Sequence, residues 1–343
     1  MRIRDEWPEV RAVLGCLTAR RAANALAVWA SYWAARWTRR PHVWGWPVTL
    51  GVEPTTACNL RCPHCVSGLR AFERPTGRLD ATLYQQVIDE LAPDLLYLML
   101  YFQGEPYIHP QFIELVEYAA RKGLFVTTST NGHFLDDESA RRTVESGLGK
   151  LIVSLDGTTA ESYATYRVGG DFEAVLEGIR RVVAWKRRLR RRLPVVDVQF
   201  IVFQHNEGEV EAVQALGRRL GADRVRLKTA QVYDFEAADR WLPTDTASRR
   251  YERDGQGGWR LRGRIPDHCW KVWIGAQMTW DGRLVPCCFD KNAEQELGRA
   301  DETGVRPLWK KGAAYRQFRQ RLLGGRQQIS LCTNCSEGVK LWV

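Results

Sequence analysis

Apolar runs alternate with helix-like segments along most of the chain from residue 48 onward. Short runs rich in valine, leucine, isoleucine and phenylalanine predict six strands, over residues 48–53, 95–101, 124–128, 150–155, 195–203 and 223–228. Amphipathic patterns between them predict helices near residues 80–92, 110–122, 137–146, 171–192 and 206–220. Strands that alternate with helices are typical of βα units around a parallel sheet. We therefore expect an α/β domain with six parallel strands, fewer than the eight of a complete TIM barrel.

The alternation begins and ends at clear points, which divide the 343 residues into four predicted parts. Residues 1–47 precede it and are basic and rich in tryptophan. Residues 48–240 carry the βα units, and residues 241–264, which include a glycine-rich stretch, form a predicted linker. Residues 265–343 have no βα rhythm and hold a second group of cysteines.

Polar motifs follow each predicted strand, at the end where parallel α/β sheets collect their chemistry. In chain order they are residues 58–65, 103–106 (QGEP), 129–132 (STNG), 154–157 (SLDG), 204–206 (QHN) and 228–229 (KT). Since parallel strands end at one edge of the sheet, we expect these motifs to lie together.

Three cysteines in the first motif, Cys58, Cys62 and Cys65, have CxxxCxxC spacing. A structural zinc ion takes four ligands, and an ordinary [4Fe–4S] cluster takes four cysteines. A cluster held by three leaves one iron open to another ligand. The alternatives are a zinc knuckle or buried thiols.

This loop resembles the cluster loop of the radical S-adenosylmethionine (SAM) enzymes. The resemblance implies a partial (β/α)6 TIM-type barrel and a [4Fe–4S] cluster whose open iron binds SAM. It also implies reductive cleavage of SAM to a 5′-deoxyadenosyl radical, which abstracts hydrogen from a substrate. Such a cluster needs a reductant, such as flavodoxin or ferredoxin, and iron–sulfur assembly favours a cytoplasmic location.

The same resemblance assigns SAM contacts to residues on the predicted strand ends. They are His64, Gly104, Glu105, Ser129, Asn131, Ser154, Asp156 and Arg167. His64 takes the place of an aromatic that packs on adenine, and Gly104 lets the backbone approach the SAM ammonium. Three roles stay open for Asp156: ribose ligand, substrate-facing acid or helix cap. Arg167 either faces the SAM carboxylate or forms a surface salt bridge.

The second cysteine group is similar to the SPASM/Twitch extensions of radical SAM enzymes. Cys269, Gly282 and Cys287 match their CxnGx4C hairpin, with residues 281 and 282 as a two-residue turn. Cys332 and Cys335 complete four thiolates, which fill one auxiliary [4Fe–4S] cluster. The alternative is zinc. Cys288 is left over, and the count implies the shorter single-cluster Twitch variety, so two [4Fe–4S] clusters in all.

The spacing is most similar to that of a dehydrogenase with one auxiliary cluster. The resemblance therefore implies an oxidoreductase acting on a small molecule or sugar-like alcohol, with the auxiliary cluster accepting an electron. The alternatives are modification of a lipid or lipid-linked substrate, peptide maturation, and a non-enzymatic iron–sulfur scaffold or electron carrier. Candidates for the substrate base are Asp156, His205, Lys228, Tyr233 and Asp234. Asn206 is expected to cap the following helix.

Residues 20–40 combine tryptophans with arginines. Helical spacing places Leu26, Trp29, Trp33 and Trp37 on one face. The apolar stretch is too short to cross a bilayer. Two interpretations remain: an interfacial helix at the inner face of a membrane, or an accessory helix that packs its aromatic stripe onto the catalytic domain.

The net charge of +10 adds little to this picture. Eight arginines against three acids in residues 1–47 supply half of it. A basic balance alone does not choose among anionic partners, and we expect no nucleic-acid partner. The basic run at residues 186–192 is expected to be a solvated helix end.

Overall fold

The computed structural model describes residues 3–233 and 235–338. Its main feature is a curved nine-stranded sheet with the order β11-β10-β9-β1-β2-β3-β4-β5-β6. Six strands, all parallel, form the predicted partial barrel. They are β1 (Thr49–Val52), β2 (Tyr97–Met99), β3 (Phe125–Thr130), β4 (Lys150–Ser154), β5 (Val195–Val202) and β6 (Arg224–Thr229). Each lies inside or within two residues of its predicted run, which confirms the fold class.

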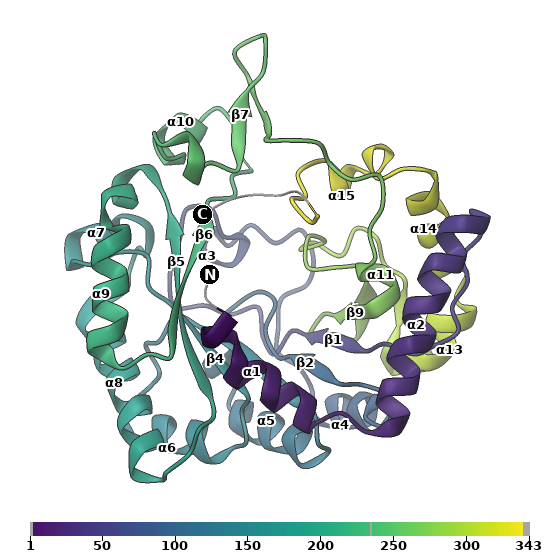
Figure 1. Cartoon of the computed structure of the whole chain (residues 1–343), viewed down its shortest axis with the longest axis horizontal. Helices are drawn as coiled ribbons and strands as arrows, with labels where there is room; N and C mark the ends of the chain where they lie inside the picture. Colours follow the sequence, from purple (N-terminus) through teal and green to yellow (C-terminus); the bar gives the residue numbers. More distant parts are fainter. Residues whose placement is uncertain (1–2, 234, 339–343) are drawn as a thin grey trace.

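Amphipathic helices cover the outside of this sheet, as Figure 1 shows. The predicted ones are α4 (Ala81–Leu91), α5 (Phe112–Arg121), α6 (Asp137–Glu145), α8 (Phe172–Arg188) and α9 (Val210–Leu220). The sequence pattern missed α7 (Ala160–Tyr166) and α3 (Val66–Leu69). Side chains such as Leu98, Val126 and Leu151 are fully buried between sheet and helices. Burial of each contributes roughly 1.5–3 kcal/mol, which is the main reason these runs become central strands.

The carboxyl-terminal part continues the barrel sheet rather than forming a sheet of its own. Strand β9 (Gly275–Met278) pairs in parallel with β1, and β10 (Arg283–Val285) and β11 (Gly298–Arg299) follow antiparallel. The β9–β10 turn holds three residues, 280–282, with Gly282 at φ 84°, where the sequence predicted a two-residue turn. The left-handed residue closes a three-residue hairpin loop of the kind that ends in a bulge. The helices here are α11 (Lys271–Ile274), α12 (Ala300–Thr303), α13 (Val305–Lys311), α14 (Ala313–Gly324) and α15 (Ser330–Thr333).

Residues 241–264, the predicted linker, are mostly structured. They hold a two-stranded hairpin, β7 (Tyr251–Arg253) and β8 (Trp259–Leu261), preceded by the short helix α10 (Ala238–Trp241). Figure 1 shows this hairpin projecting beyond the carboxyl end of β6.

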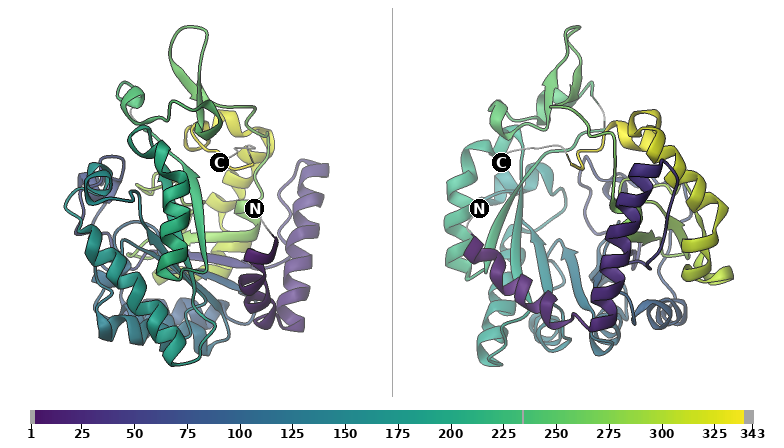
Figure 2. Two further views of the ribbon diagram at one scale, coloured as in Figure 1. Left: turned by 60° about the vertical axis from the view of Figure 1, so that its left-hand side comes forward. Right: turned by 45° about the vertical axis from the view of Figure 1, so that its right-hand side comes forward.

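Two helices precede the barrel, α1 (Ile3–Gly15) and α2 (Ala19–Thr38). Figure 2 places them together along one side of the molecule. Helix α2 packs on the domain through Val28, Tyr32 and Ala35, not through its aromatic stripe. The expectation that the stripe itself packs inward is therefore corrected: Trp29, Trp33 and Trp37 are all exposed.

Candidate cluster and cofactor site

The loop with Cys58, Cys62 and Cys65 follows β1 and leads into helix α3, with Cys65 at the N-cap position. Gly68 on that helix lies so close to the loop that a Cβ would meet the Cys62 nitrogen at 2.5 Å. None of the three forms a disulfide, and Cys62 is buried. Burial raises the pKa of Cys62 to about 11, because the thiolate is disfavoured away from water. A metal that replaces the thiol protons removes this cost.

The Gly104–Glu105 turn packs directly on this cysteine loop. The Gly104 N–H donates to Ser67 Oγ at 2.8 Å, and the Glu105 N–H donates to the Ala57 carbonyl at 2.7 Å. Gly104 has a φ of 74°, and a Cβ there would lie 2.2 Å from the Thr55 carbonyl oxygen. Only glycine fits this position, because the backbone here lies against the cluster loop. The approach of Gly104 to the SAM ammonium stays a prediction.

The Glu105 carboxylate is occupied by the chain itself. It accepts hydrogen bonds from Thr130 Oγ1 at 2.7 Å, from the Asn131 N–H at 2.7 Å and from the Tyr107 N–H at 3.2 Å. Burial raises its pKa to about 7 despite these donors. Glu105 therefore holds the end of β3 against the end of β2.

Asn131, held in this way, faces the cysteines. Its Nδ2 donates to Asn59 Oδ1 at 2.7 Å and lies 4.0 Å from Cys58 Sγ. Ser129 is half-buried and Ser154 is buried, on the neighbouring strands β3 and β4. The structure thus brings these predicted residues to one edge of the sheet.

Arg167 and Asp156 form a buried ion pair beside the cysteine loop. Arg167 Nε donates to Asp156 Oδ2 at 2.6 Å, while its Nη1 lies 3.9 Å from Cys62 Sγ. Asp156 is fully buried, and its Oδ1 accepts from the Ile201 N–H at 2.7 Å. Burial alone would lower the pKa of Arg167, but the Asp156 charge raises it well above its usual value. The pair keeps a cation beside the thiol, and Arg167 is no surface salt bridge.

An aromatic group that the sequence did not reveal packs behind the loop. His64 contacts Trp241 edge to face at a ring distance of 4.9 Å, and Trp241 also packs on Tyr166 and Phe203. Three of these side chains belong to separate elements, so no sequence spacing could have linked them. The sequence predicted that His64 packs on adenine, and in the structure the edge-to-face contact with Trp241 already gives this ring an aromatic neighbour.

The remaining candidates for a substrate base differ in setting. His205 stacks on Phe203 at 5.6 Å, and burial lowers its pKa. Lys228 is exposed, and Tyr233 lies under the Lys291 ammonium at 4.1 Å. Asp234 lies outside the described residues. Asn206 does not cap α9; its side chain accepts from the Phe203 N–H and donates to the Asp156 carbonyl.

The auxiliary cysteines lie on loops that a buried arginine draws together. Arg326, 1% exposed, donates through Nη1 to the carbonyls of His268 at 3.2 Å and Glu337 at 2.7 Å. It thereby ties the segment of Cys269 to the segment of Cys335. Burial raises the pKa of Cys332 to about 11, as it does for the other buried thiols. Cys288 is exposed.

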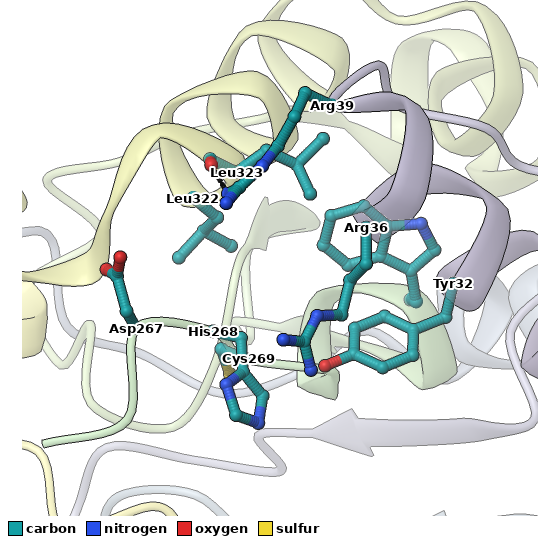
Figure 3. A pocket seen from close by; sticks show the side chains of 9 residues that line it. Tyr32, Arg36, Arg39, Asp267, His268, Cys269, Leu322 and Leu323 are labelled. Atoms are coloured by element: carbon teal, nitrogen blue, oxygen red, sulfur yellow. Dashed lines mark hydrogen bonds between the residues drawn. The ribbon is translucent and has the colours of Figure 1, made fainter.

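Helix α2 forms one wall of this region. Figure 3 shows Tyr32 and Arg36 pointing from α2 toward His268 and Cys269 across a small pocket of about 110 Å³. Arg39 closes the pocket by donating to the Leu323 carbonyl at 2.8 Å. The amino-terminal segment is thus built into the surroundings of Cys269.

A larger cavity of about 630 Å³ extends from the end of β2 to the auxiliary cysteine region. Gln103, next to the Gly104 turn, lines one part of it, and Cys287 and Cys288 line another. Its wall is mainly apolar and aromatic: Tyr97, Met99, Tyr101, Phe102, Trp270 and Ile274. The charged groups are Lys271, Glu337 and Lys291; Lys271 and Glu337 pair at 3.2 Å.

The donor set fits iron–sulfur clusters. Thiols are the ligands such clusters use, and eight of the nine cysteines, seven of them predicted ligands, lie in these two regions. Within residues 3–233 and 235–338, no three Cys, His, Asp or Glu side chains are grouped to hold one metal ion. No helix in the described part of the chain has the length and apolarity to cross a membrane.

Two family models match the chain in the order that the cysteines predict. The model described as the radical SAM superfamily matches residues 52–216, and the model of an iron–sulfur cluster-binding domain, SPASM, matches residues 269–336. Both matches contain the predicted cysteine ligands of their region.

Curated relatives and a solved structure point the same way. The chain is 34% identical to mycofactocin maturase MftC of Mycobacterium ulcerans over 51% of this chain and 46% of that protein, so the match spans about half the relative's length. It is 26% identical to PqqA peptide cyclase of Gluconobacter oxydans over 86% and 84%. The structure of Streptococcus suis SuiB bound to precursor peptide SuiA aligns over 85% of this chain and 72% of that one, at 12% identity and a TM-score of 0.63.

That structural likeness shows a shared fold, and the family models cover both cysteine regions. The chain belongs to the radical SAM superfamily and carries a carboxyl-terminal SPASM-type iron–sulfur domain.

Proposed function

We propose that this chain is a radical SAM enzyme that modifies a peptide. The observation that carries the proposal is the convergence of Cys62, Gly104, Asn131 and Arg167 at one strand edge. Gln103, the neighbour of Gly104, lines a cavity that also reaches Cys287. Cys58, Cys62 and Cys65 would hold a [4Fe–4S] cluster with one open iron. Bound there, cluster and SAM supply a 5′-deoxyadenosyl radical.

The chain's own residues prepare that site. Asn131 and Arg167 bring an amide and a guanidinium next to the thiols, at 4.0 and 3.9 Å from Cys58 and Cys62 sulfur. Both groups donate hydrogen bonds, so they suit the carboxylate and hydroxyl oxygens of SAM. We propose that Glu105 and Asp156 position these two groups and do not contact SAM themselves. Glu105 holds the Asn131 backbone, and Asp156 holds the Arg167 guanidinium.

Cys269, Cys287, Cys332 and Cys335 would fill a second, closed cluster, which makes two [4Fe–4S] clusters in all. Arg326 supports this assignment because it joins the loops of Cys269 and Cys335 from inside. A closed cluster exchanges electrons but binds no SAM. Its position across the cavity from Gln103 suits the removal of an electron from a substrate held between the two sites.

The residues that line the cavity favour a substrate that carries an apolar or aromatic side chain near an acidic group. Its wall is mostly hydrocarbon and ring, which binds such side chains better than a polyhydroxylated sugar. Lys291 lies over the Tyr233 ring and is in no ion pair between described residues, so its charge can meet a substrate carboxylate. Two relatives are named for peptide substrates. The sugar-like alcohol inferred from the cysteine spacing stays a prediction.

The test measures whether deuterium passes from a substrate to 5′-deoxyadenosine. Reconstituted protein is incubated anaerobically with SAM, dithionite and a deuterated fraction of low-mass cell extract, with or without prior protease digestion. We expect deuterium in the 5′-deoxyadenosine with the undigested fraction and its loss after digestion. Mass spectrometry of the nucleoside measures both.

Two outcomes would contradict the proposal. Deuterium transfer that survives protease digestion would assign the substrate to small molecules. Absence of any 5′-deoxyadenosine from protein that holds its full iron content would reject radical SAM chemistry and leave a scaffold or electron carrier. An Arg167→Lys variant serves as the control, since it keeps the charge but not the paired donor geometry, and we expect a lower rate.

A further inference from the structure

The two amino-terminal helices expose an apolar surface that the proposed chemistry does not use. We call it the Trp–Leu face: Trp7, Leu14, Leu26, Trp29, Trp33 and Trp37. All six side chains are more than two-fifths exposed, and Trp37 is 94% exposed. Tryptophan is a large, mostly apolar side chain, so four of them in solvent on two neighbouring helices need an explanation.

Each helix is fixed to the barrel by its opposite side, which keeps the Trp–Leu face outward. Helix α1 turns Glu6 and Glu9 inward, where they bind Arg224. Helix α2 buries Arg21, whose guanidinium donates to the carbonyls of Ala92 and Gly123. In the left view of Figure 2, both helices lie along one edge of the molecule, with no other segment outside them.

Cations without acidic partners accompany this face. Among the described residues, no ion pair includes Arg11, Arg36, Arg39 or Arg40. Arg11 and Arg40 are exposed, and the Arg36 guanidinium lies 5.4 Å from the Trp33 ring centre. Because Glu6 and Glu9 are turned inward, the outer side of both helices presents arginine and tryptophan with little negative charge. This combination matches the interface of an anionic bilayer, where indole rings sit at headgroup depth beside lipid phosphates.

We propose that the Trp–Leu face binds peripherally to an anionic membrane surface. Exposed tryptophans provide apolar contact, and the exposed Arg11 and Arg40 provide attraction to lipid phosphate. None of the six side chains of the Trp–Leu face lines the 630 Å³ cavity, so this inference does not depend on the peptide substrate or on SAM cleavage. It places the enzyme on a lipid surface with the barrel in water.

The test is co-sedimentation of the full chain with sucrose-loaded vesicles. One set is pure phosphatidylcholine, and the other contains about one-third phosphatidylglycerol. We expect binding to the anionic vesicles that weakens with added salt. Replacement of Trp29→Ser, Trp33→Ser and Trp37→Ser together is expected to reduce the bound fraction roughly tenfold.

Two double variants distinguish attraction at the Trp–Leu face from an effect of the net charge of the protein. The double variant Arg11→Gln, Arg40→Gln is expected to reduce binding roughly tenfold at low salt. The matched control Arg190→Gln, Arg191→Gln removes the same charge from exposed positions after α8 and is expected to bind like the unaltered protein. Iron content and thermal midpoint verify that every variant folds.

Three results would overturn the proposal. The first is failure of the unaltered protein to sediment with anionic vesicles. The second is equal loss of binding in the control pair, which would mean that only net charge matters. The third is a dimer, seen by sedimentation velocity, that the tryptophan variant dissociates, which would assign the face to a second copy of the chain.

Discussion

Glu105 illustrates how one buried carboxyl can organise a site without touching a cofactor. Its oxygens accept from Thr130, Asn131 and Tyr107, and so join the ends of two strands. Burial nevertheless raises its pKa to about 7. The folded protein therefore holds a proton on Glu105 over a pH range in which the unfolded chain has already released it.

Glu105→Gln is expected to remove a pH dependence of stability. The benefit of Glu105 is complete below its ordinary pKa and is lost as pH rises toward about 7. The total loss is roughly 3 kcal/mol. Thermal midpoints of both proteins between about pH 5 and about pH 8 check this. A constant difference between the two curves would mean that Glu105 does not titrate in this range.

At the scale of elements, α1 closes the amino-terminal end of the barrel with charge rather than with apolar contact. Glu9 accepts from Lys150 Nζ at 2.6 Å and pairs with Arg224, and Asp197 completes the group. These residues come from α1, β4, β5 and β6. Burial alone would raise the pKa of Glu9, but the hydrogen bonds from Lys150 and Arg224 lower it.

Glu9→Gln is expected to destabilise the protein by roughly 1–3 kcal/mol at neutral pH. Because the folded pKa of Glu9 is lowered, its contribution is present above the ordinary pKa and disappears as pH falls through the lowered value. The gap between the two proteins should therefore close in acid. The control Glu138→Gln breaks an exposed pair with Arg141 on α6 and should leave the thermal midpoint unchanged. An equal change of the thermal midpoint in both variants would show that the buried α1 network contributes no more stability than an exposed ion pair.

The sequence predicted most elements of the barrel and the edge where the site lies. Fully buried strands give continuous apolar runs, and the cysteine spacing is local, so both can be seen along the chain. The α1 network could not be seen, because Glu6 and Arg224 are joined only by the fold. The same holds for Trp241 beside His64 and for β9 beside β1. The part of the Trp–Leu face on α2 was visible as a stripe, but its outward direction and the contribution of Trp7 and Leu14 from α1 were not.

At the scale of the whole molecule, the two cysteine regions are parts of one sheet. Cys58 follows β1, and Cys287 follows β10, which pairs with β9 beside β1. Arg74 adds a link of its own, since it binds Glu53 after β1 at 2.6 Å and donates to the Lys291 carbonyl at 2.7 Å. Both regions are therefore attached to the same sheet.

Iron analysis separates the two proposed clusters. The reconstituted chain is expected to hold about eight iron atoms, and the triple variant Cys58→Ala, Cys62→Ala, Cys65→Ala about four. Cys288→Ser, the matched control, is expected to keep about eight. Zinc in place of the retained iron, or complete loss of iron in the triple variant, would contradict two independent clusters.

The pairing of β9 with β1 has a consequence for electron transfer. Register fixes Val52 opposite Met278, the Cys58 loop follows β1, and the Cys287 loop follows β10, the partner of β9. Redox centres on such loops would keep one separation whether or not a substrate is bound. The distance that an electron tunnels between the two centres would then be fixed by the pairing of the strands. A bound substrate could change only the driving force of the transfer.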